Sequence, residues 1–348
     1  MIFTFSWLLF LSLLLLFIPH PYGVFSVVAV IFFTVSCWVA LVGGFNAMRE
    51  VIEAYTQQEL QESPPQPPPL RVAQPLRRLL IVGAARGLGL EVSTLARSKG
   101  TWEVHSADVA LSGEEFVDLT RPATVQALCA SLARSGVRHL HALVLAAGVC
   151  DAEPVKVLNS SLPRMVWVNF LGHAVVLQEL KVHGVVVDRI IIISSGSYVR
   201  GSRAGSFFPV HWTPLGAMAA YAQSKYLLTI WASWLRRSSC KVDVTILNPG
   251  PMRSAIGDPH VPLFLWPVYG LMKEILFPLP AVAARAVLHF TEALHPEEYV
   301  HIRTKKPLIR DVTHDVTFEW LLEHARVAFR EVGYRWRVEH PALRQEKR

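Results

Sequence analysis

The sequence predicts an α/β fold, with a doubly wound parallel β-sheet preceded by a transmembrane helical hairpin. From residue 78 onward, short apolar segments of strand length alternate with segments of helical length. A glycine-rich turn joins the first of these strands to the first helix. The 48 residues at the amino terminus contain no Asp, Glu, Lys or Arg. Continuous apolar strands that alternate with helices are typical of a parallel sheet covered on both faces.

The composition excludes several classes of protein. Apolar residues make up 52% of the 348 residues and charged residues 18%, which excludes an intrinsically disordered chain. The 4 cysteines have no metal-site spacing and are too few for a small disulfide scaffold. The net charge of +7 is dispersed along the chain rather than gathered in a basic helix. We therefore predict no nucleic-acid partner and no metal.

Residues 1–48 form the predicted membrane anchor. Two apolar runs, Ile2 to Ile18 and Val24 to Val42, flank a turn that contains Pro21 and Gly23. At 1.5 Å per residue the second run spans about 28 Å, close to the hydrocarbon thickness of a bilayer. A helical hairpin also satisfies its own backbone hydrogen bonds, as lipid requires. A cleaved signal peptide is the alternative, but no basic residue precedes the first run.

Three further segments follow the anchor. Residues 49–77 are predicted to be a polar helix and a Pro-rich linker, because the run Pro64 to Pro69 favours extended polyproline geometry. The folded domain is expected over residues 78–310. Residues 311–348 are expected to form a C-terminal helix and a basic tail.

Within the folded domain, strands and helices are expected to alternate. The expected strands cover residues 79–82, 102–107, 116–119, 140–145, 189–193, 242–247 and 299–303, and the expected helices cover residues 90–97, 123–134, 166–180, 221–234, 281–294 and 318–332. Such alternation implies right-handed crossovers, with ligands bound at the carboxyl ends of the strands. The apolar segment from Pro262 to Pro280 is expected to contact a lipophilic ligand or the bilayer surface, or else to be ordinary core.

A glycine-rich turn, Gly83 to Gly89, follows the first strand. Such a turn lets backbone approach a pyrophosphate, while the helix after it offers free N–H groups. Asp108 ends the second strand, where a carboxylate can bind the ribose hydroxyls of adenosine or simply cap a loop. Arg86, within the turn, can instead pair with a 2′-phosphate. NAD or NADP is the expected cofactor, with NAD slightly favoured.

Tyr221 and Lys225 lie four residues apart at the start of an expected helix, and so on one helical face. An ammonium near a phenol favours the phenolate, so we expect Lys225 to lower the pKa of Tyr221. Ser195 follows the strand 189–193, and its hydroxyl can hold a substrate oxygen. The spacing alone also fits a surface pair. The position of Tyr221 and Lys225, after a glycine turn and after a serine at the end of a strand, favours a catalytic role for the pair.

Over about residues 78 to 303 the chain resembles the short-chain dehydrogenase/reductase family. The resemblance is carried by Gly83, Gly87, Gly89, Ala147-Gly148, Asn169, Ser195, Tyr221, Lys225 and Pro249-Gly250. The interval between Ser195 and Tyr221 most resembles the retinol-dehydrogenase-like branch. The insertion in that interval, Gly201 to Met218, contains aromatic residues that are expected to wall a lipophilic pocket, namely Phe207, Phe208, His211 and Trp212.

The resemblance implies a Rossmann fold and a set of roles. Tyr221 would be the general acid/base, and Lys225 would lower its pKa and bind the nicotinamide ribose. Ser195 would orient the substrate oxygen, and Asn169 would support a water-linked proton path. The implied cofactor-binding residues are Gly83, Arg86, Gly87, Leu88, Gly89, Asp108, Asp118, Ala147, Gly148, Tyr221, Lys225, Pro249 and Gly250.

The implied function is NAD(P)-dependent hydride transfer to or from a lipophilic alcohol or carbonyl compound, of the retinoid, sterol or fatty-chain class. The sequence departs from the family at Val82, where Thr is usual, and at Ala146, where Asn is usual. These departures leave open a second hypothesis, a cofactor-binding but catalytically weak scaffold or regulatory protein.

The expected partners are a small lipophilic substrate and a membrane, and a homodimer is left open. The expected location is the endoplasmic reticulum membrane or a similar one. The catalytic domain is expected on the cytosolic side, because cofactor supply and the lack of disulfide pairing suit it.

Overall fold

The computed structural model describes residues 76–152, 155–201, 214–238, 242–254, 256, 266–292, 299–301 and 318–337. The predicted anchor and all but the last two residues of the predicted linker lie outside these ranges. No helix in the described ranges is both long and apolar enough to cross a membrane. The chain divides into two compact units, and the fold below is that of the unit formed by Val72–Gly270 and Phe277–Arg348.

Within the described residues, six parallel strands form the main sheet in the order β2-β1-β4-β6-β7-β8. The strands are β1 (Arg77–Val82), β2 (Trp102–Ala107), β4 (Ala142–Leu145), β6 (Arg189–Ile193), β7 (Asp243–Asn248) and β8 (Tyr299–His301). The order of winding reverses at β1, because β2 pairs with one side of it and β4 with the other. Parallel sheets bind ligands at such a switch point. The predicted doubly wound sheet is confirmed.

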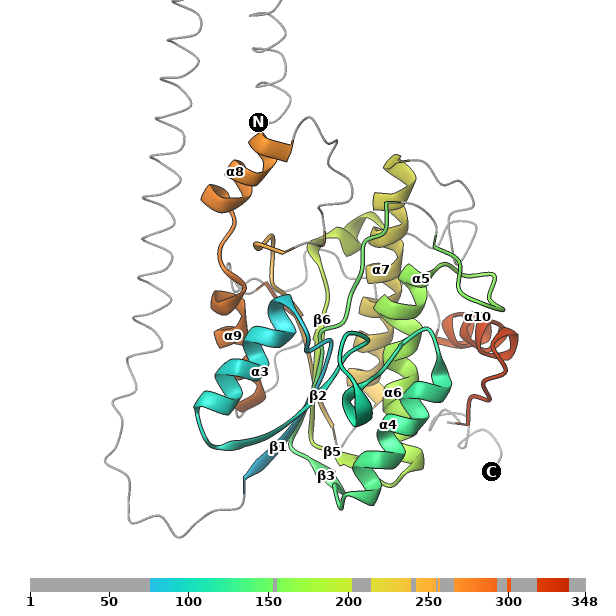
Figure 1. Cartoon of the computed structure of the whole chain (residues 1–348). Helices are drawn as coiled ribbons and strands as arrows, with labels where there is room; N and C mark the ends of the chain where they lie inside the picture. The colour runs from blue at the N-terminus through green and yellow to red at the C-terminus, as the bar shows by residue number, and fades with distance from the viewer. Residues whose placement is uncertain are drawn as a thin grey trace, which may run out of the picture. The chain divides into compact units, whose positions relative to one another are not determined.

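Helices cover both faces of this sheet. The described helices of the chain are α3 (Gly87–Ser98), α4 (Pro122–Arg134), α5 (Arg164–Val166), α6 (Gly172–Val182), α7 (Pro214–Ser238), α8 (Trp266–Leu276), α9 (Pro280–Glu292) and α10 (Phe318–Glu331). Helix α8 crosses the boundary between the two units. Helices α3 and α9 lie on one face, and α4, α6 and α7 lie on the other (Figure 1).

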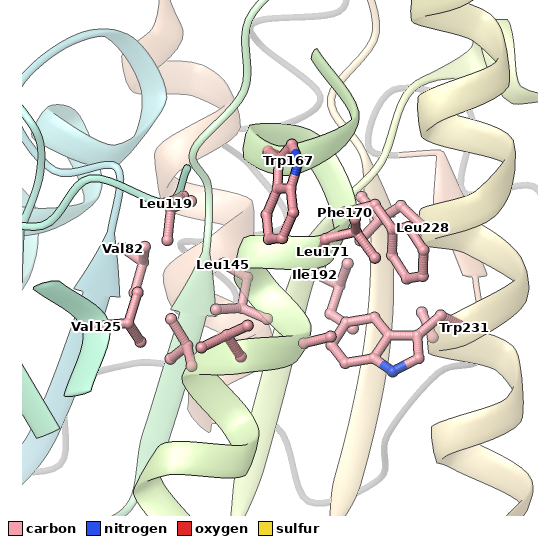
Figure 2. Close-up of a cluster of buried hydrophobic side chains, with 14 of the residues drawn as sticks. Val82, Leu119, Val125, Leu145, Trp167, Phe170, Leu171, Ile192, Leu228 and Trp231 are labelled. Carbon is pink, nitrogen blue, oxygen red and sulfur yellow. The ribbon is translucent and has the colours of Figure 1, made fainter. Parts of the chain in front are cut away.

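The side chains of β1 alternate between these two faces. Leu79 and Ile81 are buried with residues of α3 and α9, whereas Leu80 and Val82 are buried with residues of α4, α6 and α7. Figure 2 shows part of this second cluster, in which Trp231 of α7 lies beside Phe170. Every apolar side chain of the strand therefore has a helix to pack against, as the continuous apolar run predicted.

The predicted strand at residues 116–119 was wrong. It is reduced to a single bridge between Phe116 and Asp108, preceded by the 3₁₀ turn η1 (Gly113–Glu115). The backbone N–H of Asp118 donates to the hydroxyl of Thr124 (3.0 Å), so a side chain takes the hydrogen bond that a strand ladder would need.

The predicted strand at residues 140–145 is divided at His141. Its backbone N–H donates to the carbonyl of Arg78, and its Nδ1 accepts the N–H of Arg78 at 2.9 Å. The ladder of the main sheet therefore starts only at Ala142. The preceding strand β3 (His139–Leu140) pairs instead with β5 (Val186–Val187) in a separate two-stranded sheet.

Two predicted helices also differ in detail. The helix predicted at residues 221–234 starts at Pro214, so the last residues of the insertion are its first turns. The segment predicted as one helix at residues 166–180 consists of α5, the π-helical turn η2 (Trp167–Leu171) and α6 in direct succession. The strands predicted at residues 102–107 and 189–193 have the observed bounds.

Candidate active site

The glycine turn after β1 requires glycine at two positions. Gly83 has φ +95°, and a Cβ on it would overlap the backbone nitrogen of Ala147. A Cβ on Gly89 would overlap the carbonyl oxygen of Gly83. Gly87, also at positive φ (+56°), faces open space. The turn is therefore compact against its neighbours and open beside Gly87.

Helix α3 begins at this open side. Its N-cap residue, Arg86, makes no side-chain capping hydrogen bond, and its side chain is exposed. The first N–H groups of a helix have no partner inside the helix, and together with the helix dipole they attract an anion. The turn therefore fits a phosphate group. Leu88 is buried, so its backbone rather than its side chain is available to a ligand.

Asp108 joins the glycine turn to the end of β2. Its Oδ2 accepts the N–H of Ala85 (3.1 Å), and its Oδ1 accepts the N–H of Ala110 (3.0 Å). The carboxylate thus caps two loops and remains half-buried beside the turn. Each carboxylate oxygen can accept a second hydrogen bond. The two interpretations from the sequence, a loop cap and a ribose ligand, are compatible.

Asp118, the other predicted acidic cofactor residue, has a local role. Its Oδ1 accepts both the backbone N–H (2.9 Å) and the hydroxyl (2.7 Å) of Thr120. These bonds fix the turn that leads into α4. No described contact joins Asp118 to the glycine turn.

The four predicted catalytic residues lie around the carboxyl ends of β4 and β6. Tyr221 is buried in α7, and its phenol is hydrogen-bonded to the side chain of Ser195, which follows β6. One turn further along α7, Lys225 is also buried, and its Nζ donates to the carbonyl of Ile193 (3.1 Å). A Cβ built on Gly148, after β4, would lie 3.4 Å from Lys225 Nζ and 3.5 Å from Asn169 Oδ1.

Asn169 clamps the segment after β4 to α7. Its Oδ1 accepts the N–H of Val149 (2.8 Å), and its Nδ2 donates to the carbonyl of Val149 and to the hydroxyl of Ser224 (both 2.9 Å). The residue is fully buried in η2, and single π turns occur often at functional sites. The side chain of Asn169 is occupied by these hydrogen bonds, which hold the site in place. Only its backbone is therefore available for the predicted proton path.

His173 was not among the site residues predicted from the sequence. It lies one turn after Asn169, is fully buried, and its Nε2 is 3.1 Å from the carbonyl oxygen of Ala147. Burial lowers the pKa of His173 to about 3, so the ring is neutral and donates from Nε2. The spacing of four residues from Asn169 was the available signal, because it places both side chains on one face.

Backbone contacts brace Val82 and Ala146, the two positions where the sequence departs from the family that it resembles. The N–H groups of Ala146 and Ala147 both donate to the carbonyl of Val82 at 2.9 Å. The polar side chains usual at positions 82 and 146 are therefore not needed to join β1 to β4. At the end of β7, Asn248 Oδ1 accepts the N–H of Gly250 (3.1 Å) and turns the chain at Pro249-Gly250.

Burial dominates the electrostatics of the catalytic pair. It raises the pKa of Tyr221 to about 12, against the opposing effect of the hydrogen bond from Ser195, and it lowers the pKa of Lys225 to about 8. The expectation that Lys225 lowers the pKa of Tyr221 was wrong for this structure. Burial removes water from around the charged forms of both groups, the Tyr221 phenolate and the Lys225 ammonium. The Lys225 ammonium donates to the carbonyl of Ile193. Tyr221 is consequently a phenol, not a phenolate, at neutral pH.

No protein-family model matches the chain, and no curated protein matches its sequence. Solved structures of similar fold do match. An uncharacterized protein from Mycobacterium Paratuberculosis is 18% identical with a TM-score of 0.52, over 75% of this chain and 95% of that chain. The 3-alpha-hydroxysteroid dehydrogenase from Pseudomonas sp. B-0831, complexed with NADH, is 20% identical with a TM-score of 0.48, over 64% and 95%.

A third match is an oxidoreductase of the short-chain dehydrogenase/reductase family from Brucella ovis, in complex with a partially ordered NAD. It is 19% identical with a TM-score of 0.43, over 65% of this chain and 99% of that chain. At these identities the likeness concerns the fold. The chain has a parallel-sheet α/β fold of the Rossmann type.

Proposed function

We propose that this protein is a nicotinamide-dependent oxidoreductase of the short-chain dehydrogenase/reductase family. The observation that carries the proposal is the buried group at the carboxyl ends of β4 and β6. There the phenol of Tyr221 is hydrogen-bonded to Ser195, and Lys225 follows one helical turn later. A surface tyrosine beside a solvated lysine, the alternative considered from the sequence, is excluded because both side chains are buried.

The cofactor is NAD or NADP, with NAD slightly favoured. The glycine turn fits a pyrophosphate, since its backbone packs closely at Gly83 and Gly89 and is open beside Gly87. Asp108 would accept hydrogen bonds from the adenosine ribose and repel a 2′-phosphate. Arg86, exposed in the same turn, would favour NADP instead. When bound, the dinucleotide supplies or accepts the hydride. The solved structures from Pseudomonas and Brucella ovis contain NADH and NAD, respectively.

The chain's own residues handle the proton. Tyr221 keeps its proton at neutral pH, and a protonated phenol is suited to donate to the oxygen of a carbonyl. Ser195, hydrogen-bonded to that phenol, would hold the same oxygen. Lys225 uses one of its three donors on Ile193, which leaves two for ribose hydroxyls. These states favour the reduction of a carbonyl over the oxidation of an alcohol.

The substrate is a lipophilic alcohol or carbonyl compound, of the retinoid, sterol or fatty-chain class. Ile256 supports this assignment, because its Cδ1 lies 3.9 Å from a Cβ built on Gly148 while the residue remains 39% exposed. An apolar side chain thus lies beside the site at its solvent-exposed edge. The uncharged run of residues 1–48 supports a membrane anchor. The proposed location is the endoplasmic reticulum membrane or a similar one, with the catalytic domain in the cytosol, where the cofactor is supplied.

The experiment is a reductase assay on the full chain with NADH or NADPH and a panel of lipophilic aldehydes and ketones. Replacing Tyr221 with Phe removes only the proton donor. We expect Tyr221→Phe to lose about 10²- to 10⁴-fold in kcat while binding NADH as the wild type does. Tyr226→Phe is the matched control, because Tyr226 lies on the same helix but packs against Gly201. Equal turnover by Tyr221→Phe and wild type, with cofactor still bound, would favour the catalytically weak scaffold.

A further inference from the structure

A hollow lies in the domain, away from the candidate active site. It is a cavity of about 530 Å³ between α6, α7, α10 and the first residues of β6 and β7. Its volume falls within the range of about 300–1,000 Å³ typical of small-ligand sites. Ile190 lines it near the start of β6, whereas Ser195 follows the end of that strand. At about 3.3 Å per residue these positions are separated by about 16 Å.

Two pairs of aromatic side chains line this cavity. Phe170 and Trp231 meet edge to face with their ring centroids 6.0 Å apart. Phe329 stacks on Trp336 with their ring centroids 5.0 Å apart. Figure 2 shows the first of these pairs within the core cluster. Most of the remaining lining is aliphatic, including Leu177 of α6 and Val244 of β7.

Buried polar contacts hold the segment after α10, which contributes Trp336 to the lining. After α10, the hydroxyl of Tyr334 donates to Glu179 Oε1 (2.6 Å), and the backbone N–H of Arg337 donates to Gln178 Oε1 (2.9 Å). Because Glu179 and Gln178 are buried in α6, these bonds tie the segment after α10 to α6. Hydrogen bonds therefore fix the position of this part of the cavity lining.

One cation lies at the opening of the cavity. Lys181, in the last turn of α6, lines the cavity and is exposed to solvent. No carboxylate among the described residues forms an ion pair with it. Two other polar side chains of the lining have partners of their own. Gln178 binds the segment after α10, and the Ser238 hydroxyl donates to the carbonyl of Trp234 (2.9 Å).

We propose that this cavity binds a long-chain carboxylate, such as a fatty acid, at a site separate from the catalytic one. The apolar walls would take the hydrocarbon chain, because burial of apolar surface is the main driving force for such a ligand. The Lys181 ammonium would pair with the carboxylate at the opening. Helices α6 and α7 line this cavity, and α7 also contains the catalytic pair.

The test uses a photoactivatable palmitate analogue on the purified full chain, with the labelled peptides mapped by mass spectrometry. We expect labels on α6, α7 and α10, and protection by excess palmitate. Excess NADH and excess hexadecanol, which lacks the carboxylate, should protect poorly.

Lys181→Glu should reduce labelling at least tenfold. Lys156→Glu, an exposed lysine outside the cavity lining, is the matched control and should label as the wild type does. Ala325→Phe, which places a ring in the cavity, should also abolish labelling.

Three results would overturn the proposal. Labels around Tyr221 that NADH removes would place the fatty acid in the catalytic site. Equal labelling of wild type and Lys181→Glu would remove the carboxylate contact, and this variant alters only an exposed side chain, so its folding is not in question. Palmitate binding that disappears as the chain self-associates would assign the cavity to a second copy of the chain.

Discussion

Replacing Lys225 with Met should make the protein more stable at neutral pH while it abolishes the proposed reductase activity. Lys225 is buried, and the burial lowers its pKa from 10.5 to about 8. At pH 7 the folded protein therefore holds a charge that has lost its water. At about 1.4 kcal/mol per pKa unit, the difference of about 2.5 units corresponds to about 3 kcal/mol.

The sign of this effect follows from proton binding. Between pH 8 and pH 10.5 the unfolded lysine keeps its proton and the folded one does not, so Lys225 makes the wild type more stable as the pH rises through this window. Lys225→Met lacks that contribution. The variant also leaves the Ile193 carbonyl without its donor, at a cost of about 1 kcal/mol that is the same at every pH.

The measurement is urea unfolding of wild type and Lys225→Met from pH 6.5 to 10.5. The stability advantage of the variant should decrease by about 3 kcal/mol between pH 7 and pH 10.5. Titration of the tyrosines affects both proteins and cancels in the difference. Lys156→Met, at an exposed position, is the control and should give a constant difference. A constant difference for Lys225→Met as well would refute the argument that burial lowers the pKa of Lys225.

Two further predictions concern the cofactor site. Gly89→Ala should weaken NADH binding at least tenfold and cost about 1–3 kcal/mol of stability, because its Cβ would overlap the carbonyl oxygen of Gly83; fluorescence titration and urea unfolding measure both. Asp108→Asn should raise the KM for NADH about tenfold but leave or lower that for NADPH, because the repulsion of a 2′-phosphate is removed; steady-state kinetics with both cofactors measure this.

Each of these two variants has a control. Gly270→Ala adds the same methyl group in α8, where nothing lies within 4 Å, and should bind NADH normally. Asp188→Asn changes an exposed carboxylate before β6 and should leave the ratio of the two KM values unchanged. Normal NADH binding by Gly89→Ala would show that the turn does not hold the pyrophosphate. Parallel changes in both KM values for Asp108→Asn would show that the residue acts only as a loop cap.

Much of the fold could be predicted because its signals are local. The run Leu79 to Val82 is apolar at every position, as a strand covered on both faces must be. The spacing of Tyr221 and Lys225 places both on one face of a helix whatever surrounds them. In the same way, the glycines of the turn mark a close approach of backbone before the neighbouring chain is known.

The remaining features depend on which segments meet in space. No sequence pattern shows that His141 exchanges hydrogen bonds with Arg78 and so divides a strand, or that His173 reaches the carbonyl of Ala147. The direction of the pKa shift at Tyr221 also depended on tertiary structure. Spacing along a helix brings a cation near the phenol, but the loss of water around both groups comes from distant segments that close over them. The sequence by itself determined which groups can carry the chemistry, and the tertiary structure decided how burial shifts their pKa values.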